Sequence, residues 1–347
     1  MRRFILLINS ILQPFASLDA KGRMVLCLLL FISSCKKDAP IEDSGNDIIT
    51  LQVPKGFPYP VIPSDNQPTQ NRIDLGRKIF FDPILSRDST ISCGSCHHTD
   101  IKFTDGLQFS NGIDGNHTIR NAMTILNSAY QPYMFWDGGN PTLEQQVLAP
   151  IANPLEMDFD VNQVVARMNN HPEYPVLFQK AYGQAPSVYT LTRAIACYER
   201  TLFTGFSRYD DYLYNNNTAA LTQSEINGKN IFFGEQGECF HCHNEYNFTD
   251  YSFKNNGLYL HYADSGRARI TGLSSDVGKF KIPSLRNVEL TAPYMHDGSK
   301  ATLEDVIEHY NSGGQPHPNK SGLIQPLNLT SQEKQDLINF LKSLTDL

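Results

Sequence analysis

The sequence of 347 residues has no basic stripe. Acidic residues outnumber basic ones, 36 against 29, which gives a net charge of −7. Such a chain has no electrostatic footprint for a phosphate backbone, so we expect no binding of nucleic acid. Signals for β-strands are also weak, whereas Pro and Gly punctuate long loops. With 40% hydrophobic and 19% charged residues, the composition is still typical of a globular protein and not of a disordered one.

The apolar run Met24–Ile32 is too short to span a bilayer. Basic residues precede it, and two serines and Cys35 follow, so residues 1–35 have the pattern of an export signal. The end of this segment resembles the lipobox of bacterial lipoproteins, in which the cysteine is lipidated; a plain signal peptide is the alternative. We therefore expect an exported, periplasm-facing lipoprotein, anchored to the membrane through Cys35, with residues 36–65 as a polar tether.

Four of the seven cysteines form two C-x-x-C-H motifs. This pattern is the attachment signature of haem c, in which the two thiols form thioethers and the adjoining histidine binds the iron. A structural zinc site and a C-x-x-C redox pair are the alternatives, but neither requires a histidine directly after each pair. The sequence predicts two covalent haem c groups, held by Cys93, Cys96 and His97 and by Cys239, Cys242 and His243.

A similar segment precedes each motif: residues 76–81 read GRKIFF and residues 228–233 read GKNIFF. This internal repeat predicts a helix that leads into each haem loop. Thr222 and Glu225 form a capping box for the second of these helices. The last segment repeats this box and then places apolar residues on one face, which predicts an amphipathic terminal helix. We expect a mainly α fold with two cytochrome c-like haem domains in tandem, residues 66–203 and 204–347, with long loops.

The region between the two haem motifs contains FTDG, RNA-x-T-x-LN, FWDG, LEQQ-x-x-x-P and NPLEM, and the C-terminal part contains PSLRNVELTAPY and HDG. Together these motifs resemble those of the bacterial di-haem cytochrome c peroxidases and their MauG-type relatives. The resemblance covers roughly residues 70–345. It implies that the N-terminal haem is the site of reaction and that the C-terminal haem transfers electrons.

By this resemblance, Glu156 is the group that moves protons during peroxide cleavage, and Gln146 is its hydrogen-bonding neighbour. Trp136, the single tryptophan, would lie between the two haems and carry an electron or a hole. A core tryptophan is the alternative, and both roles are compatible. The resemblance also implies a calcium site that uses Asn121 and the backbone carbonyls of Thr291 and Pro293, because oxygen donors suit calcium.

The segment TLEDVIEHY, residues 302–310, contains two candidates for the sixth ligand of the second iron, His309 and Tyr310. Helical periodicity places Tyr310 on the apolar stripe and predicts that His309, about 100° away around the helix, lies on the solvated side. In the ordinary peroxidases of this family the matching position is methionine, and in MauG it is tyrosine. Tyr310 is therefore the predicted ligand, with Met295 as its rival and a packed, non-ligating tyrosine as the alternative. A phenolate would lower the potential of the haem.

Three functions are compatible with these residues. The first is a peroxidase that reduces hydrogen peroxide with electrons from a donor such as a small cytochrome c. The second is a MauG-like oxidase that modifies a protein or small substrate, which Tyr310 favours. The third is a di-haem electron carrier, which would not need Glu156 or Gln146. The resemblance favours the first and also implies a homodimer.

In typical family members a loop histidine occupies the sixth position of the first iron at rest, but the matching residue here is Ile113. An isoleucine cannot bind iron, and His117 is out of register, as expected of an exposed loop histidine. We predict a first haem that is open without prior reduction. The electron paramagnetic resonance spectrum of the isolated ferric protein should contain a high-spin component. A purely low-spin, bis-histidine signal from the first haem would contradict this prediction.

Overall fold

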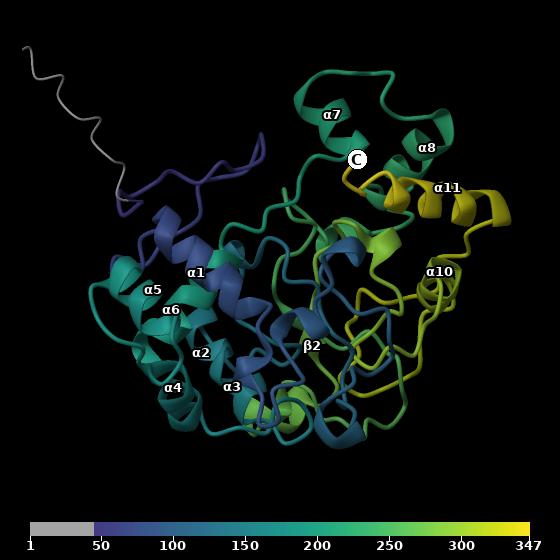
Figure 1. The fold of residues 1–347 in the computed structure, drawn as a ribbon. Coiled ribbons are helices and arrows are strands. Elements are labelled where there is room, and N and C mark those ends of the chain that lie inside the picture. The colour runs from purple at the N-terminus through teal and green to yellow at the C-terminus, as the bar shows by residue number, and fades with distance from the viewer. Residues whose placement is uncertain (1–44) are drawn as a thin grey trace, which may run out of the picture. The chain divides into compact units, whose positions relative to one another are not determined.

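The computed structural model describes residues 45–347, shown in Figure 1. Helices dominate this part of the chain, and its two strands are only two residues long, which confirms the mainly α fold class. The α-helices are α1 Gln70–Phe80, α2 Leu143–Gln146, α3 Leu148–Ala152, α4 Val161–Asn169, α5 Tyr174–Tyr182, α6 Val188–Glu199, α7 Arg208–Tyr214, α8 Gln223–Phe232, α9 Ala268–Thr271, α10 Leu303–Asn311 and α11 Ser331–Lys342. The strands are β1 Phe253–Lys254 and β2 Phe280–Lys281, which pair antiparallel.

The expected export segment, residues 1–35, lies outside the described residues, as do Cys35 and the first part of the tether. Within residues 45–347, no helix combines the length and the apolar character needed to cross a bilayer.

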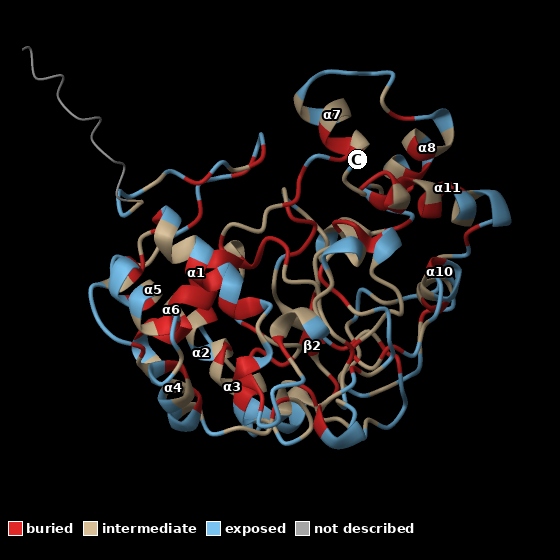
Figure 2. Ribbon diagram, viewed as in Figure 1, coloured by how far each residue is buried: buried red, intermediate tan, exposed pale blue. Residues whose placement is uncertain are grey.

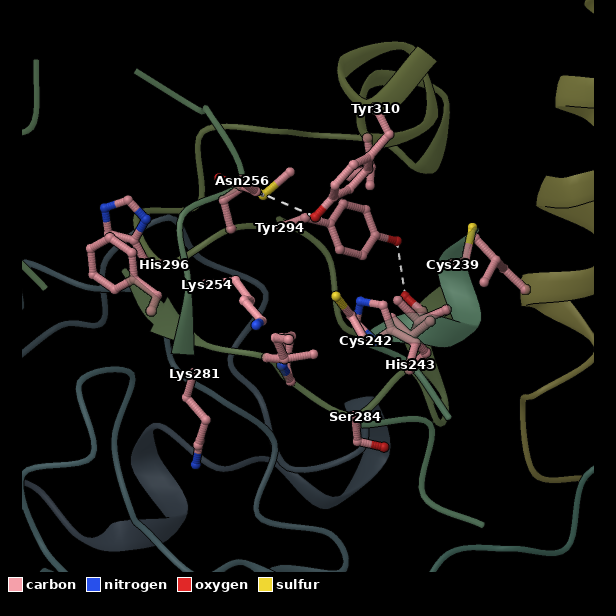
Figure 3. Close-up of a pocket in the computed structure, with 18 of the residues that line it drawn as sticks. Cys239, Cys242, His243, Lys254, Asn256, Lys281, Ser284, Tyr294, His296 and Tyr310 are labelled. Carbon is pink, nitrogen blue, oxygen red and sulfur yellow. Dashed lines mark hydrogen bonds between the residues drawn. The ribbon is translucent and has the colours of Figure 1, made fainter. Parts of the chain in front are cut away.

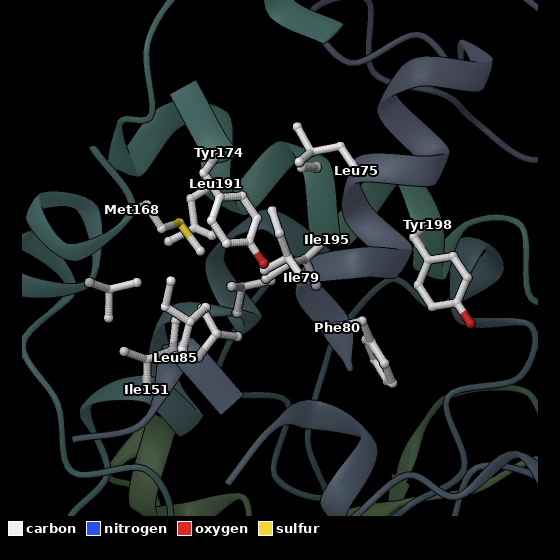
Figure 4. Close-up of a cluster of buried hydrophobic side chains, with 14 of the residues drawn as sticks. Leu75, Ile79, Phe80, Leu85, Ile151, Met168, Tyr174, Leu191, Ile195 and Tyr198 are labelled. Atoms are coloured by element: carbon white, nitrogen blue, oxygen red, sulfur yellow. The ribbon is translucent and has the colours of Figure 1, made fainter. Parts of the chain in front are cut away.

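Helices α1, α3, α4, α5 and α6 contribute to one hydrophobic core, which Figure 4 shows in close-up. Helix α1 begins after Thr69, whose side chain accepts a hydrogen bond from the backbone N–H of Arg72. It packs along α6, and most residues of α6 are buried, as the colouring of Figure 2 shows. Cys197 on α6 is one of these buried residues, as expected for a small apolar side chain without a further role. The fully buried side chains of this core include those of Ile79, Phe80, Leu85, Val164, Met168, Tyr174, Phe178, Leu191 and Ile195.

A second core lies among α7, α8, α10 and α11. The predicted capping boxes are present at the starts of α8 and α11, where Thr222 and Thr330 bond reciprocally with the glutamates three residues later. Helix α11 packs along α8, and its apolar face is buried as the periodicity predicts. The residues of that face are Leu337, Ile338, Leu341 and, just past the helix end, Leu344.

The segment between α6 and α7 connects the parts of the chain that carry the two cores. Residues 45–347 nevertheless belong to one compact unit. The domain boundary between residues 203 and 204 therefore stays a prediction.

A glycine allows each haem-leading helix to touch its partner helix. A Cβ at Gly76 on α1 would lie 1.9 Å from the carbonyl oxygen of Ala194 on α6. A Cβ at Gly228 on α8 would lie 2.0 Å from the carbonyl oxygen of Asp336 on α11. Since no side chain fits at these distances, the two helix pairs are held at backbone contact by the same residue type at the repeated position.

The internal repeat also continues beyond the segments that the sequence indicated. Asn127 and Asn287 have the same left-handed backbone, with φ 58° and ψ 21°, and each precedes a short 3₁₀ helix. An isolated antiparallel bridge follows in both copies, Met134 with Asn140 and Tyr294 with Lys300. In both copies a threonine then caps the next helix, Thr142 for α2 and Thr302 for α10. The loops over the two haem motifs thus follow one backbone plan.

The substitution Gly76→Ala should destabilise the protein, because the added methyl group would overlap the carbonyl of Ala194 and force the two helices apart. We expect a loss of roughly 1–3 kcal/mol, measured by chemical denaturation of the holoprotein. Gly322→Ala is the matched control, since a Cβ there meets nothing within 4 Å. Equal stability of the two variants would contradict the close crossing.

Candidate functional site

Both C-x-x-C-H motifs fold in the same way. Each begins with a 3₁₀ turn, Cys93–Ser95 and Cys239–His241. The backbone N–H of each histidine donates to the carbonyl of the first cysteine, at 3.0 Å for His97 and 2.9 Å for His243. The turn therefore places two thiols and one imidazole together, and none of the four cysteines forms a disulfide.

One hydrogen bond fixes the orientation of each imidazole. The Nδ1 atom of His97 lies 2.9 Å from the carbonyl oxygen of Phe103, and Nδ1 of His243 lies 3.0 Å from that of Phe248. Because a carbonyl only accepts, Nδ1 carries the hydrogen and Nε2 keeps its lone pair for a metal. Burial lowers the pKa of both histidines, which favours the neutral form that binds metal.

The accepting carbonyls belong to a repeated Phe-Thr-Asp triplet, residues 103–105 and 248–250. The motif FTDG named above contains the first copy, but the second copy was not predicted to be part of the site. Phe103 and Phe248 both have positive φ, 59° and 51°. This conformation is uncommon for a bulky residue and turns each carbonyl back toward the histidine. The signal was available in the sequence: the same three letters follow both motifs within seven residues.

A cavity lies beside the second motif, and Figure 3 shows the side chains around it. Cys239, Cys242 and His243 line it from the haem loop. Met295 and Tyr310 also line it, so both candidate sixth ligands reach the same space. Figure 3 shows Tyr310 directed from α10 into this space.

The prediction for His309 was wrong. Its side chain is buried, with 8% exposure, and Nε2–H donates to the backbone carbonyl of Asn256 at 3.1 Å. The neighbouring Tyr310 also contacts Asn256: its hydroxyl oxygen lies 3.4 Å from Nδ2 of Asn256. Helical periodicity identified the apolar stripe of α10, with Leu303 and Ile307 buried, but not the loop that covers its adjoining face.

Two hydrogen bonds hold Trp136 in place. It lines the cavity, and its indole N–H donates to the carbonyl of Asn121 at 2.9 Å. Its own carbonyl accepts the N–H of Lys281 in β2 at 2.7 Å. The residue is thus held by one hydrogen bond at its indole nitrogen and one at its backbone carbonyl. Thr104, from the triplet that follows the first motif, lines the same cavity.

The three residues predicted to hold calcium, Asn121, Thr291 and Pro293, line this cavity as well. The side-chain amide of Asn121 donates to the carbonyl of Leu107 at 2.8 Å, which leaves its Oδ1 atom as the acceptor. These donors are oxygens and include no thiol or imidazole, so the set suits a hard cation such as calcium.

Glu156 is half-buried near the first motif. Asn153 donates to its carboxylate at 2.7 Å, and burial raises the pKa of Glu156 despite that bond. Burial raises the pKa of the Cys96 thiol to about 11, and the negative charge of Glu156 contributes a smaller part of this rise. Among the described residues, no hydrogen bond joins Glu156 to Gln146, the predicted neighbour, and Asn153 takes that place.

Ile113 is buried beside Glu156. Its exposure is 1%, and its N–H donates to the carbonyl of Glu156 at 2.9 Å. The loop packs closely there, because a Cβ at Gly112 would lie 2.0 Å from the carbonyl of Leu155. His117 is exposed on the same loop, as expected.

Comparisons with known proteins agree with this geometry. The sequence profile described as di-haem cytochrome c peroxidase, of the CCP_MauG type, matches residues 70–218. Cytochrome-c peroxidase IdrP1 of Pseudomonas sp. (strain SCT) is 36% identical, over 83% of this chain and 84% of that protein. The methylamine utilization protein MauG of Methylorubrum extorquens is 33% identical, over 88% of this chain and 87% of that protein.

This chain belongs to the di-haem cytochrome c peroxidase and MauG family. Among solved structures, a MauG-like protein associated with microbial copper homeostasis superposes with a TM-score of 0.81. It is 40% identical, and the match covers 85% of this chain and 95% of that one. Membership makes the protein an oxidoreductase of the peroxidase class with haem c cofactors. The half-buried imidazoles of His97 and His243, each with Nδ1 bonded to a backbone carbonyl, fit such groups.

One buried acid near the first motif has no role among the residues described so far. Glu199 on α6 is buried, and its Oε2 atom has no hydrogen-bond partner within the described chain. Burial raises the pKa of Glu199 to about 8, so the carboxyl is largely neutral at pH 7. Its sequence context, a polar residue in an apolar helix, carried no signal of this environment.

Intact-mass measurement should find two covalent haems on a protein of this family, one for each motif. The double substitution Cys93→Ala with Cys96→Ala removes both thioethers of the first site and should reduce the mass by one haem. The substitution Cys197→Ala, at a buried cysteine outside both motifs, should leave the count at two. A wild-type protein with fewer than two haems would contradict the assignment.

Proposed function

We propose that this protein reduces hydrogen peroxide to water at its N-terminal haem site, with electrons relayed from a donor through its C-terminal haem site. Each turnover consumes one peroxide, two protons and two electrons and releases two waters. The observation that carries the proposal is the half-buried Glu156 near a half-buried histidine–thiol motif of the haem c type.

Haem c bound at the first site would supply an iron that binds and activates peroxide. The residues around it handle the protons. Glu156 accepts a proton from the near oxygen of peroxide and returns it to the far oxygen, which leaves as water. Asn153 holds the carboxylate in place through its 2.7 Å bond. The side chain of Ile113, next to Glu156, has no atom that could bind the iron of such a haem.

Trp136 is the proposed bridge for electrons between the two sites, because its indole and its backbone are both held by hydrogen bonds and it lines the cavity beside the second motif. His97 and His243 would bind the two irons, and the four motif cysteines would form the thioethers. Asn121, Thr291 and Pro293 would hold calcium near this bridge. A small cytochrome c or a similar protein would supply the electrons.

The chain would act outside the cytoplasm. The export pattern of residues 1–35 supports a lipoprotein anchored through Cys35 and facing the periplasm. Covalent haem c agrees with that compartment. A homodimer is the assembly that the family resemblance favours.

A second function is favoured by one observation, the presence of Tyr310 in the cavity of the second site. A MauG-like enzyme would use peroxide equivalents to oxidise a protein or small substrate, and a tyrosine ligand would suit it by lowering the potential of the second haem. Such an enzyme would consume peroxide slowly with reduced cytochrome c and faster with its own substrate.

Steady-state turnover of peroxide with reduced cytochrome c tests the proposal. Glu156→Gln should lower kcat/KM for peroxide by roughly 10²–10⁴-fold, because the amide cannot accept the proton. In the wild type, only the deprotonated carboxylate is active and burial raises its pKa. The acid limb of the pH profile should therefore lie above the usual range of an exposed glutamate.

Glu173→Gln is the control, because this exposed carboxylate forms a surface ion pair with Lys78, away from both motifs. It should leave the rate unchanged. Slow turnover of the wild type with a long-lived oxidised state would favour the MauG-like function. No reaction with peroxide would leave an electron carrier and refute both enzymatic proposals.

A further inference from the structure

Asn256 lies between the two candidate ligands of the second site. Its side-chain nitrogen, Nδ2, is 3.4 Å from the hydroxyl oxygen of Tyr310 and 3.4 Å from the sulfur of Met295. An amide NH₂ carries two hydrogens, so it can donate to both acceptors at once. Figure 3 draws the contact between Asn256 and the hydroxyl of Tyr310 as a dashed line.

The orientation of this amide is fixed by its other contacts. Its oxygen, Oδ1, accepts the backbone N–H of Leu258 at 3.2 Å, so the nitrogen must face the two ligands. The backbone carbonyl of Asn256 accepts a hydrogen bond from His309, which anchors the residue to α10. The loop also touches the chain that follows α10, since a Cβ at Gly314 would lie 2.8 Å from this same carbonyl oxygen.

The two bonds from Asn256 have unequal strength. A hydrogen bond to an anionic oxygen is about twice as strong as one between neutral groups, whereas a thioether sulfur is a weak acceptor. A donor at this position therefore stabilises a tyrosinate more than it stabilises a methionine. The second N–H also engages the sulfur of Met295 and so occupies one of its two lone pairs.

We propose that Asn256 is a positioning residue that selects Tyr310 over Met295 as the sixth ligand of the second haem. This inference rests on the proposed function, because it requires haem c at Cys239 and Cys242. A loop residue outside the haem motifs would thus contribute to the lowered potential that a tyrosinate ligand gives a haem. His309 supports the selection by holding the backbone of Asn256 in place.

The variant Asn256→Leu tests the inference through a spectroscopic signature. Wild-type ferric protein should have tyrosinate ligation at the second haem and no thioether–iron charge-transfer band in the near infrared. The leucine variant loses both donors and should gain that band, together with a higher midpoint potential for the second haem. Asn256→Asp keeps an acceptor for the N–H of Leu258 but places a negative carboxylate next to the phenolate of Tyr310. In this variant too, the ligation should change toward Met295 and the midpoint potential should rise.

The double variant Asn256→Leu with Met295→Leu is the control, and the new band should be absent from it. Three results would overturn the inference: a thioether band in the wild type, unchanged ligation in both Asn256 variants, or a second haem without any sixth ligand in both. The ligation readout does not use peroxide. Absence of peroxide turnover would therefore refute the proposed function and leave the role of Asn256 standing.

Discussion

The positions of the haem loops in this protein depend on two helix crossings at which the backbones are in contact. Gly76 and Gly228 permit the approach of α1 to α6 and of α8 to α11, because any larger residue would overlap a carbonyl oxygen of the partner helix. Each crossing fixes the direction in which the chain leaves the leading helix and enters the C-x-x-C-H turn. The turn then presents its histidine to a carbonyl that a positive-φ phenylalanine turns toward it. A tight crossing thus determines where Nε2 points.

Local sequence signals predicted the parts of the fold that depend on neighbouring residues. The two leading helices, the capping boxes at Thr222 and Thr330, and the apolar face of α11 follow from hydrogen-bonding side chains and from a 3.6-residue period. The haem motifs were equally clear, because covalent attachment requires fixed spacing. The family resemblance supplied Glu156, which no periodic pattern would have identified.

The parts that the sequence did not reveal depend on contacts between distant segments. The register of α10 places His309 beside the apolar stripe, but a loop more than fifty residues upstream covers that side and buries the imidazole. Asn256 itself stands in a polar stretch, and its importance arises only from what surrounds it. The same holds for Asn153, which occupies the place beside Glu156 that Gln146 was expected to fill. A polar residue in a loop has no periodicity by which its partners can be inferred.

The repeated backbone plan has a consequence for how the two sites came to differ. Phe135 and Met295 occupy corresponding positions in the two copies, counted from Asn127 and Asn287, and both have a left-handed backbone. Trp136 follows in the first copy and His296 in the second. One scaffold therefore offers an aromatic pair in one copy and a thioether with an imidazole in the other. After duplication, such a pair of sites can diverge by exchange of side chains alone, without any change in the path of the chain. Division of labour between two metal centres then needs only point substitutions on a frame that is already stable.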